Sequence, residues 1–205
     1  AFTNDNRPTF QWTDATDETG YRLVIDNDPS FSDGENTYDN ANIPADVTSL
    51  EIENELPEGV WYWRVAATGA GYENWSDNVW KLTVDVTPPG KVTNLEPENN
   101  ATLNTATVTF RWTENVDEWT VPDENYENYV LYVDNDPDFS SPEYVFENND
   151  NVYTATLAAG TWYWRVSARD KSGNVGENSD WFALTITLVP SQPQLYLPEN
   201  GAVFG

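Results

Sequence analysis

Two short acidic motifs hold the residue types best suited to binding a cation. Asp26-Asn27-Asp28-Pro29 recurs as Asp134-Asn135-Asp136-Pro137. Closely spaced carboxylate and amide oxygens suit a hard cation such as calcium, which takes about six to eight oxygen ligands. The same residues also end strands, because Asp and Asn accept hydrogen bonds from nearby backbone N–H groups and Pro stops a ladder. Two interpretations follow, a strand-ending turn, which we favour, and a calcium site at Asp26, Asp28, Asp134 and Asp136.

Catalytic chemistry finds little support in the composition. The 205 residues include no His and no Cys, which excludes Ser–His–Asp and Cys–His catalysis and leaves only carboxylates for zinc. The 35 acidic residues are scattered over expected turns and edges rather than gathered as the pair that glycoside hydrolysis needs. We therefore expect no enzyme activity, no catalytic residues and no cofactor other than the calcium considered above.

Short patterns suggest two further kinds of surface chemistry. Asn74-Trp75-Ser76 and Asn100-Ala101-Thr102 match the acceptor pattern for N-glycosylation, as expected in a glycoprotein. Outward aromatic residues can form a platform for polysaccharide, although on strands they also pack against cross-strand neighbours, which is the interpretation we favour. The candidates are Tyr62, Trp75, Trp119 and Tyr163.

The net charge of −26 narrows the choice of partners. Nucleic acid binding depends on clustered Lys and Arg, so we expect no nucleic acid partner. No stretch approaches the roughly 18 consecutive apolar residues of a membrane span, so we expect no membrane insertion. An acidic coat keeps chains soluble through self-repulsion and suits an extracellular, cell-surface setting.

Apolar residues alternate with polar ones along most of the chain, which predicts β-strands. Trp61, Trp63 and Val65 share one face of a strand, and Arg64 lies on the other. Because an unpaired Arg is not tolerated in a core, the Trp face is expected to be buried. Other strands are expected at 21–25, 50–52, 79–84, 129–133, 152–157 and 181–186. Short strands separated by turn signals predict an all-β protein of the sandwich type.

The chain contains one unit written about twice. The segment WYWRV at 61–65 recurs at 162–166, and Trp12 recurs as Trp112. The period predicts two tandem sandwich domains, 1–86 and 87–189, followed by an extension, 190–205. Val86-Thr87-Pro88-Pro89-Gly90 is expected to be the linker, because adjacent prolines cannot continue a sheet.

The residues of each repeat resemble a known family. Trp12 and Trp112 precede Tyr21 and Tyr129, and the phrases DNDPSFS, GTWYWRVSARDKSGN and TPP are typical of tandem modules. They are similar to fibronectin type III and related immunoglobulin-like repeats of bacterial and archaeal secreted and cell-surface proteins. The resemblance implies extracellular spacing, adhesion or assembly. Trp61 and Trp162 stand where that family usually has its corner Tyr.

The two copies are out of phase with each other. A leader, 95–101, precedes the second copy, whereas Ala1 already aligns with Ala101, so the first domain is expected to lack its first strand. A similar leader, 197–202, follows the second copy. We expect this extension to be a strand donated to the open edge of the next molecule. The expected interface residues are Leu195, Tyr196, Leu197, Ala202, Val203 and Phe204.

The functional hypothesis is therefore an extracellular structural subunit. It would polymerise head to tail by donor-strand complementation into a pilus-like or sheath-like surface filament, with itself as its main partner. The alternative is a spacer, or a polysaccharide- or protein-binding module, of a larger secreted enzyme or adhesin. A fragment cut from a longer repeat array would also carry partial repeats at both ends.

Overall fold

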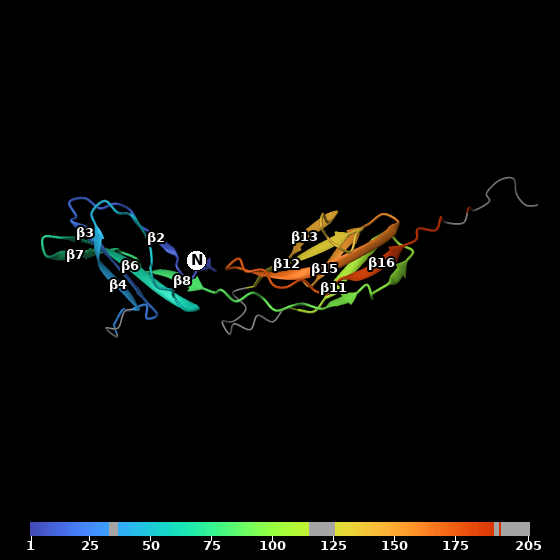
Figure 1. The fold of residues 1–205 in the computed structure, drawn as a ribbon, viewed down its shortest axis with the longest axis horizontal. Coiled ribbons are helices and arrows are strands. Elements are labelled where there is room, and N and C mark those ends of the chain that lie inside the picture. The colour runs from blue at the N-terminus through green and yellow to red at the C-terminus, as the bar shows by residue number, and fades with distance from the viewer. Residues whose placement is uncertain (33–36, 115–125, 191–192, 194–205) are drawn as a thin grey trace, which may run out of the picture. The chain divides into compact units, whose positions relative to one another are not determined.

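The computed structural model describes residues 1–32, 37–114, 126–190 and 193 of the chain (Figure 1). Its regular elements are all β-strands, which confirms the expected fold class, and no helix in these residues could span a bilayer. The described residues form two compact units. The first comprises those of Ala1–Lys91, Asn115–Asn128 and Ser167–Glu177, and the second those of Val92–Glu114, Tyr129–Val166 and Asn178–Gly205. The domain limits at 86/87 and 189/190 stay predictions.

The first half of the chain forms two sheets. Its strands are β1 (Phe2–Thr3), β2 (Thr9–Gln11), β3 (Gly20–Asp26), β4 (Tyr38–Pro44), β5 (Ser49–Glu51), β6 (Gly59–Gly69), β7 (Tyr72–Trp75) and β8 (Trp80–Val84). One sheet has the order β1-β8-β6-β3-β4, with β7 also paired to β6, and the other consists of β2 and β5.

The second half repeats this plan, with one strand more in the smaller sheet and, among the described residues, no counterpart of β7 in the larger one. Its strands are β9 (Asn94–Glu96), β10 (Ala101–Leu103), β11 (Thr107–Trp112), β12 (Tyr126–Asp134), β13 (Tyr144–Asn148), β14 (Val152–Thr156), β15 (Gly160–Asp170) and β16 (Phe182–Ile186). The larger sheet has the order β10-β16-β15-β12-β13, and the smaller one the order β14-β11-β9.

Alternating apolar side chains place the core between the two sheets of each half, as the sequence predicts. Leu23 and Ile25 on β3 and Trp61 on β6 are buried in the first core. Phe10 of β2 reaches across to Trp63 of β6, with ring centroids 5.0 Å apart. The second core repeats the contact between Phe110 and Trp164 at 5.1 Å.

On the outer face of the large sheet of each half, an arginine side chain stacks on aromatic rings. The Arg64 guanidinium lies 4.2 Å from the ring centroids of both Phe31 and Trp75. In the second half, Arg165 lies 4.2 Å from the ring of Phe139. These stacks shield the sheet, so that even Ala66, which faces outward beside Arg64, is fully buried.

A tryptophan anchors the corner before each long strand. The indole N–H of Trp61 donates to the carbonyl of Pro57 at 2.9 Å, and that of Trp162 donates to the carbonyl of Ala158 at 2.9 Å. Each bond ties the strand to the turn four residues upstream. The indole thus makes a side-chain bond to the preceding backbone at the position expected for the corner Tyr.

Candidate functional site

Strand β9 shows how the edge of the smaller sheet is completed in the second unit. It pairs with β11, with Asn94 opposite Trp112 and Glu96 opposite Arg111. Beyond the strand, the N–H of Thr113 donates to the carbonyl of Thr93 at 2.9 Å. The chain then crosses over, and β10 pairs in parallel with β16 of the larger sheet.

The first unit has a counterpart of the parallel β10–β16 pair but, among the described residues, no counterpart of β9 beside its smaller sheet. Strand β1 pairs in parallel with β8, as β10 does with β16. Strand β2, however, has only β5 beside it, and no described residue pairs with its other edge. Among the described residues, none accepts the N–H of Thr13, the equivalent of Thr113. The open edge is therefore the position that β9 occupies in the second unit.

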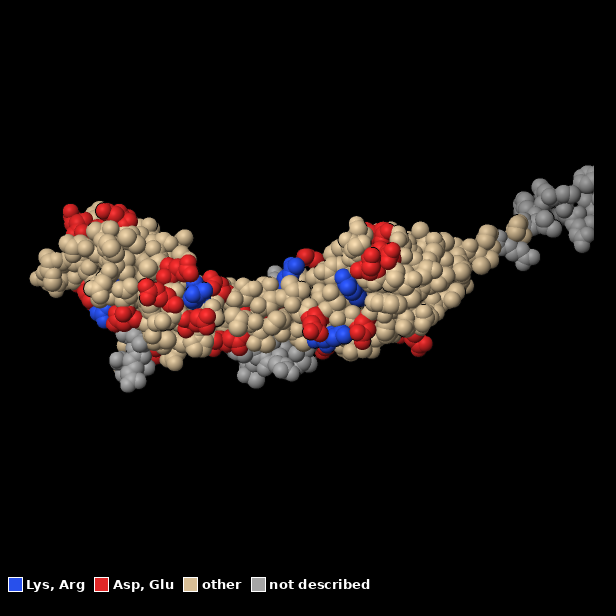
Figure 2. Space-filling model, in the orientation of Figure 1, with Lys and Arg blue, Asp and Glu red and all other residues tan. Residues whose placement is uncertain are grey.

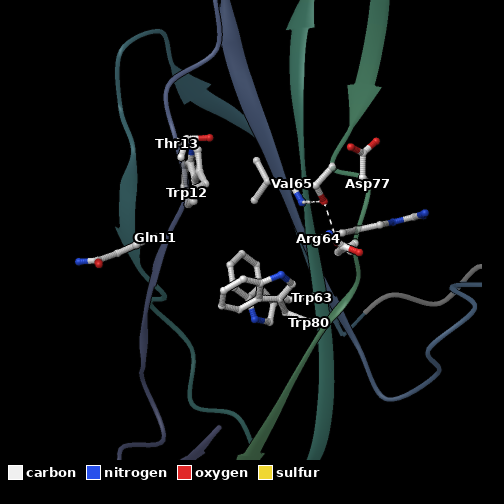
Figure 3. A pocket seen from close by; sticks show the side chains of 10 residues that line it. Gln11, Trp12, Thr13, Trp63, Arg64, Val65, Asp77 and Trp80 are labelled. Carbon is white, nitrogen blue, oxygen red and sulfur yellow. Dashed lines mark hydrogen bonds between the residues drawn. The ribbon is translucent and has the colours of Figure 1, made fainter.

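A cavity of about 550 Å³ lies along this open edge (Figure 3). Trp12 and Thr13 lie on one side of it, and Val65, beside Arg64 and Asp77, lies on the other. The indoles of Trp63 and Trp80, with ring centroids 5.7 Å apart, form its apolar part. We call this cavity, with the free edge of β2, the β2 groove.

Burial of the matching aromatic residues differs between the units. Trp112 and Trp164 are fully buried in the second unit. Their equivalents in the first, Trp12 and Trp63, are only partly buried. Trp80, which is paired with Trp63 across the sheet, has 63% of its surface exposed. Large aromatic surface left open beside an unpaired strand is the property of a sheet edge that accepts another strand.

Asn94 is the residue of β9 that enters the second unit most deeply. Its amide nitrogen donates to the carbonyls of Asp180 at 2.9 Å and Trp164 at 3.3 Å. Its amide oxygen accepts from the hydroxyl of Ser179 at 2.8 Å. The side chain is 4% exposed and links the strand of one sheet to β15 of the other.

The residues predicted for the subunit interface, 195–197 and 202–204, lie outside the described residues. In sequence, Pro97-Glu98-Asn99 matches Pro198-Glu199-Asn200, which places Leu195 at the position of Asn94. Ala202–Phe204 match the residues of β10, and the corresponding edge of β8 in the first unit is occupied by β1. The donated strand and its interface residues stay predictions.

The DNDP motif of the first unit forms a turn in which carboxylates accept backbone bonds. Asp26 accepts from the N–H of Asp28 at 3.0 Å. The carboxylate of Asp28 accepts from both the N–H and the hydroxyl of Ser30 and of Ser32, at 2.6–3.1 Å. These bonds, chiefly those from Ser30, hold the pKa of Asp28 well below its ordinary value. The geometry supports the turn, and the calcium assignment stays a prediction.

The second DNDP motif contains an unusual pair of carboxyl groups. Asp134 is 2% exposed; one of its oxygens accepts from the N–H of Asp136 at 2.9 Å, and the other is buried without a partner. Burial, together with the nearby Glu143 carboxylate, raises the pKa of Asp134. Glu143 accepts bonds from the backbone and side chain of Asn135, and these lower its pKa.

A third group of acidic residues lies elsewhere in the first unit. Oxygens of Asp14, Glu18 and Asp46 lie within 4.8 Å of one another, a spacing that suits a cation. The hydroxyl of Tyr21 donates to Asp14 and accepts from the N–H of Ala15, both at 2.7 Å. Burial raises the pKa of that Tyr21 hydroxyl. No short sequence motif contains this group, because Asp46 is distant in sequence from Asp14 and Glu18.

Two of the candidate aromatic residues make packing contacts, and the polysaccharide platform stays a prediction. Trp75 stacks on Arg64, and Tyr163 packs edge-on against Trp181 with ring centroids 5.3 Å apart. Trp119 lies outside the described residues. The glycosylation candidates Asn74 and Asn100 are both exposed, and their occupancy stays a prediction.

Acidic side chains are spread over the surface rather than gathered at one site. Figure 2 shows them on both units, with few basic groups on the visible face. One basic residue is held firmly, because Arg22 forms ion pairs with Asp39 at 2.6 Å and Glu73 at 2.9 Å. The bond to Asp39, and after it the bond to Glu73, raises the pKa of Arg22.

No protein-family model and no curated protein sequence matches the chain. Among solved structures, it is similar to the fibronectin(III)-like modules of Clostridium thermocellum CbhA, with a TM-score of 0.56 and 13% identity over 95% of this chain and 94% of that one. The fold is that of fibronectin type III-like modules. The FN1–FN3 domains of chicken CNTN1 also match, with a TM-score of 0.49 and 14% identity over 90% of this chain and 64% of that one. The sequence resemblance predicts this fold, and the prediction is confirmed.

Proposed function

We propose that the protein is an extracellular structural subunit that polymerises head to tail by donor-strand complementation into a pilus-like or sheath-like cell-surface filament. The observation that carries this proposal is the open β2 groove, which matches the β9 position of the second unit. The donor is the segment 194–200 of another copy. Its sequence repeats the Pro-Glu-Asn that follows β9, so it brings a strand of related sequence to an edge of related shape.

The chemistry of the groove supports an added strand. An incoming backbone would pair with the free edge of β2. The N–H of Thr13 would donate to it, as the N–H of Thr113 donates to the carbonyl of Thr93 in the second unit. Leu195, in the register of Asn94, would enter the apolar cavity beside Trp63 and contribute about 2 kcal/mol by burial. Each ladder hydrogen bond would add about 1 kcal/mol, against the entropy of ordering the tail.

The geometry of such a joint determines the form of the assembly. The tail of one copy meets the groove of another, so the two surfaces in contact are different, and repetition of the contact gives an open chain. The net charge of −26 makes copies repel one another. Assembly should therefore be favoured by salt, which screens this repulsion.

Light scattering on the chain with and without residues 194–205 tests the proposal. The intact chain should form species whose mass grows with concentration and with salt, and the shortened chain should remain monomeric. A matched control replaces Leu195 and Leu197 by Asp, which keeps the length of the tail and removes its apolar contacts. An intact chain that stays monomeric over a wide concentration range would contradict the proposal, and would favour a spacer module whose groove is filled from its own polypeptide.

A further inference from the structure

The second unit shows which side chain the edge position is built to receive. Asn94 makes three hydrogen bonds there, to the Trp164 carbonyl, the Asp180 carbonyl and the Ser179 hydroxyl. Because the site presents two acceptors and one hydroxyl donor, a carboxamide satisfies all three groups at once. An apolar side chain in the same place would deprive the two carbonyls of these bonds and the Ser179 hydroxyl of this acceptor, which is costly.

The β2 groove of the first unit contains the same three groups. Trp63, Asp77 and Ser76 stand where Trp164, Asp180 and Ser179 stand, and all three line the cavity. The local frame is also the same, because the N–H of Ser76 donates to the carbonyl of Val65 at 2.8 Å, as that of Ser179 does to Val166 at 2.7 Å. The Ser76 hydroxyl donates instead to the carbonyl of Asn78 at 3.0 Å.

We propose that the β2 groove selects an extended peptide segment that carries a carboxamide side chain, Asn or Gln, at the position of Asn94. The Ser76 hydroxyl turns from Asn78 to the incoming amide oxygen, and the carbonyls of Trp63 and Asp77 receive its N–H groups. This inference rests on the part of the proposed function in which the groove takes a strand. It specifies the side chain by which the groove distinguishes one incoming strand from another.

The proposed donor has no carboxamide side chain at this position. The tail places Leu195 at the selective position, so it fills the cavity without satisfying the three polar groups. The tail of this chain is then a weaker ligand for the groove than a strand of the β9 type. Replacing Leu195 by Asn should convert it into a tighter one.

Two synthetic peptides and the intact chain test this selectivity. The first peptide has the sequence of residues 86–100, and the second carries the Asn94→Leu substitution. Binding is measured by the fluorescence of the groove tryptophans or by calorimetry, and we expect the Asn peptide to bind at least about tenfold more tightly. The Ser76→Ala variant should lose most of this preference while still binding the Leu peptide.

The outcomes separate this inference from the proposed function. Equal affinity for the two peptides, or a preference that survives in Ser76→Ala, would overturn the amide selectivity. In the intact chain, Leu195→Asn should shift the onset of assembly to lower concentration by a similar factor. Assembly of the unaltered chain with no gain from Leu195→Asn would refute the selectivity alone. Tighter binding of the Asn peptide than of the Leu peptide by a chain that never assembles would support the selectivity and refute the filament.

Discussion

Substitution of Asn94 by Leu is the perturbation whose effect follows most directly from the structure. The two side chains have the same number and branching of non-hydrogen atoms, so the substitution replaces the polar atoms of the amide by methyl groups at nearly the same positions. It deletes the bonds to the Trp164 carbonyl at 3.3 Å, the Asp180 carbonyl at 2.9 Å and the Ser179 hydroxyl at 2.8 Å. The position is 4% exposed, so water cannot readily replace the lost partners.

The magnitude follows from the groups left without partners. A buried polar group that loses its hydrogen bond costs about 1–3 kcal/mol. The Ser179 hydroxyl still accepts from the N–H of Val166 at 2.9 Å, which limits its share of the loss. Greater burial of an apolar side chain offsets another part. We expect the free energy of unfolding of the second unit to fall by about 2–4 kcal/mol.

Differential scanning calorimetry of the intact chain measures this effect. A domain of about 100 residues loses roughly 4 °C or more in Tm for each kcal/mol, so the transition of the second unit should fall by at least about 8 °C. Asn94→Asp keeps an acceptor for Ser179 and places negative charge against two carbonyls, so it should be at least as damaging as Leu. The matched control is Ser76→Ala in the open groove, where we expect a change below about 1 kcal/mol. A loss below about 0.5 kcal/mol for Asn94→Leu would show that these hydrogen bonds do not stabilise the second unit.

Three further predictions concern other positions. Asp134→Asn should raise the free energy of unfolding at pH 7 by about 1 kcal/mol, measured as a rise in Tm. The reason is that an amide can donate to Glu143 where one Asp134 oxygen has no partner. The raised pKa of Asp134 gives stability that is present below its unfolded value and is lost as pH rises through its folded value, so the gain should vanish at low pH; an equal gain at all pH values would contradict this. Trp162→Phe should cost about 1 kcal/mol by removing the bond to the Ala158 carbonyl, as should Trp61→Phe with its bond to Pro57, and thermal melts that place both variants level with the parent would disprove the corner role. Chelation with EDTA should leave the Tm unchanged, because Asp28 already accepts bonds from Ser30 and Ser32; a fall of several degrees that calcium reverses would establish a metal site instead.

The buried faces were accessible from sequence because alternation reports them directly. Leu23 and Ile25, and Trp164 with Val166, are buried as their spacing predicts. This prediction succeeds because a period of two fixes which side chains face the core once a strand is assumed. That the first domain lacks its first strand stays a prediction.

Alternation of apolar and polar residues does not predict strands made mostly of polar residues or the contacts that polar side chains make. Strand β4 has few apolar positions and lies at a sheet edge, so its sequence carries no clear alternation. The role of Asn94 depends on Ser179 and Asp180, which lie more than 80 residues away in the chain. The one available signal was the repeated Ser-Asp pair, 76–77 and 179–180, and its meaning required the fold.

Cross-linking can test whether the β2 groove takes the tail of another copy, because the chain has no cysteine of its own. Thr113 bonds to Thr93 in the second unit, and Gln194 is the tail residue that matches Thr93. Cysteines introduced by Thr13→Cys and Gln194→Cys in one chain should form disulfides between copies, since paired strands hold such residues at bonding distance. If the tail pairs with β2 of another copy, a ladder of covalent multimers should appear on a non-reducing gel, and neither single variant should produce it. A monomeric band alone, whether closed on itself or unreacted, would contradict this pairing.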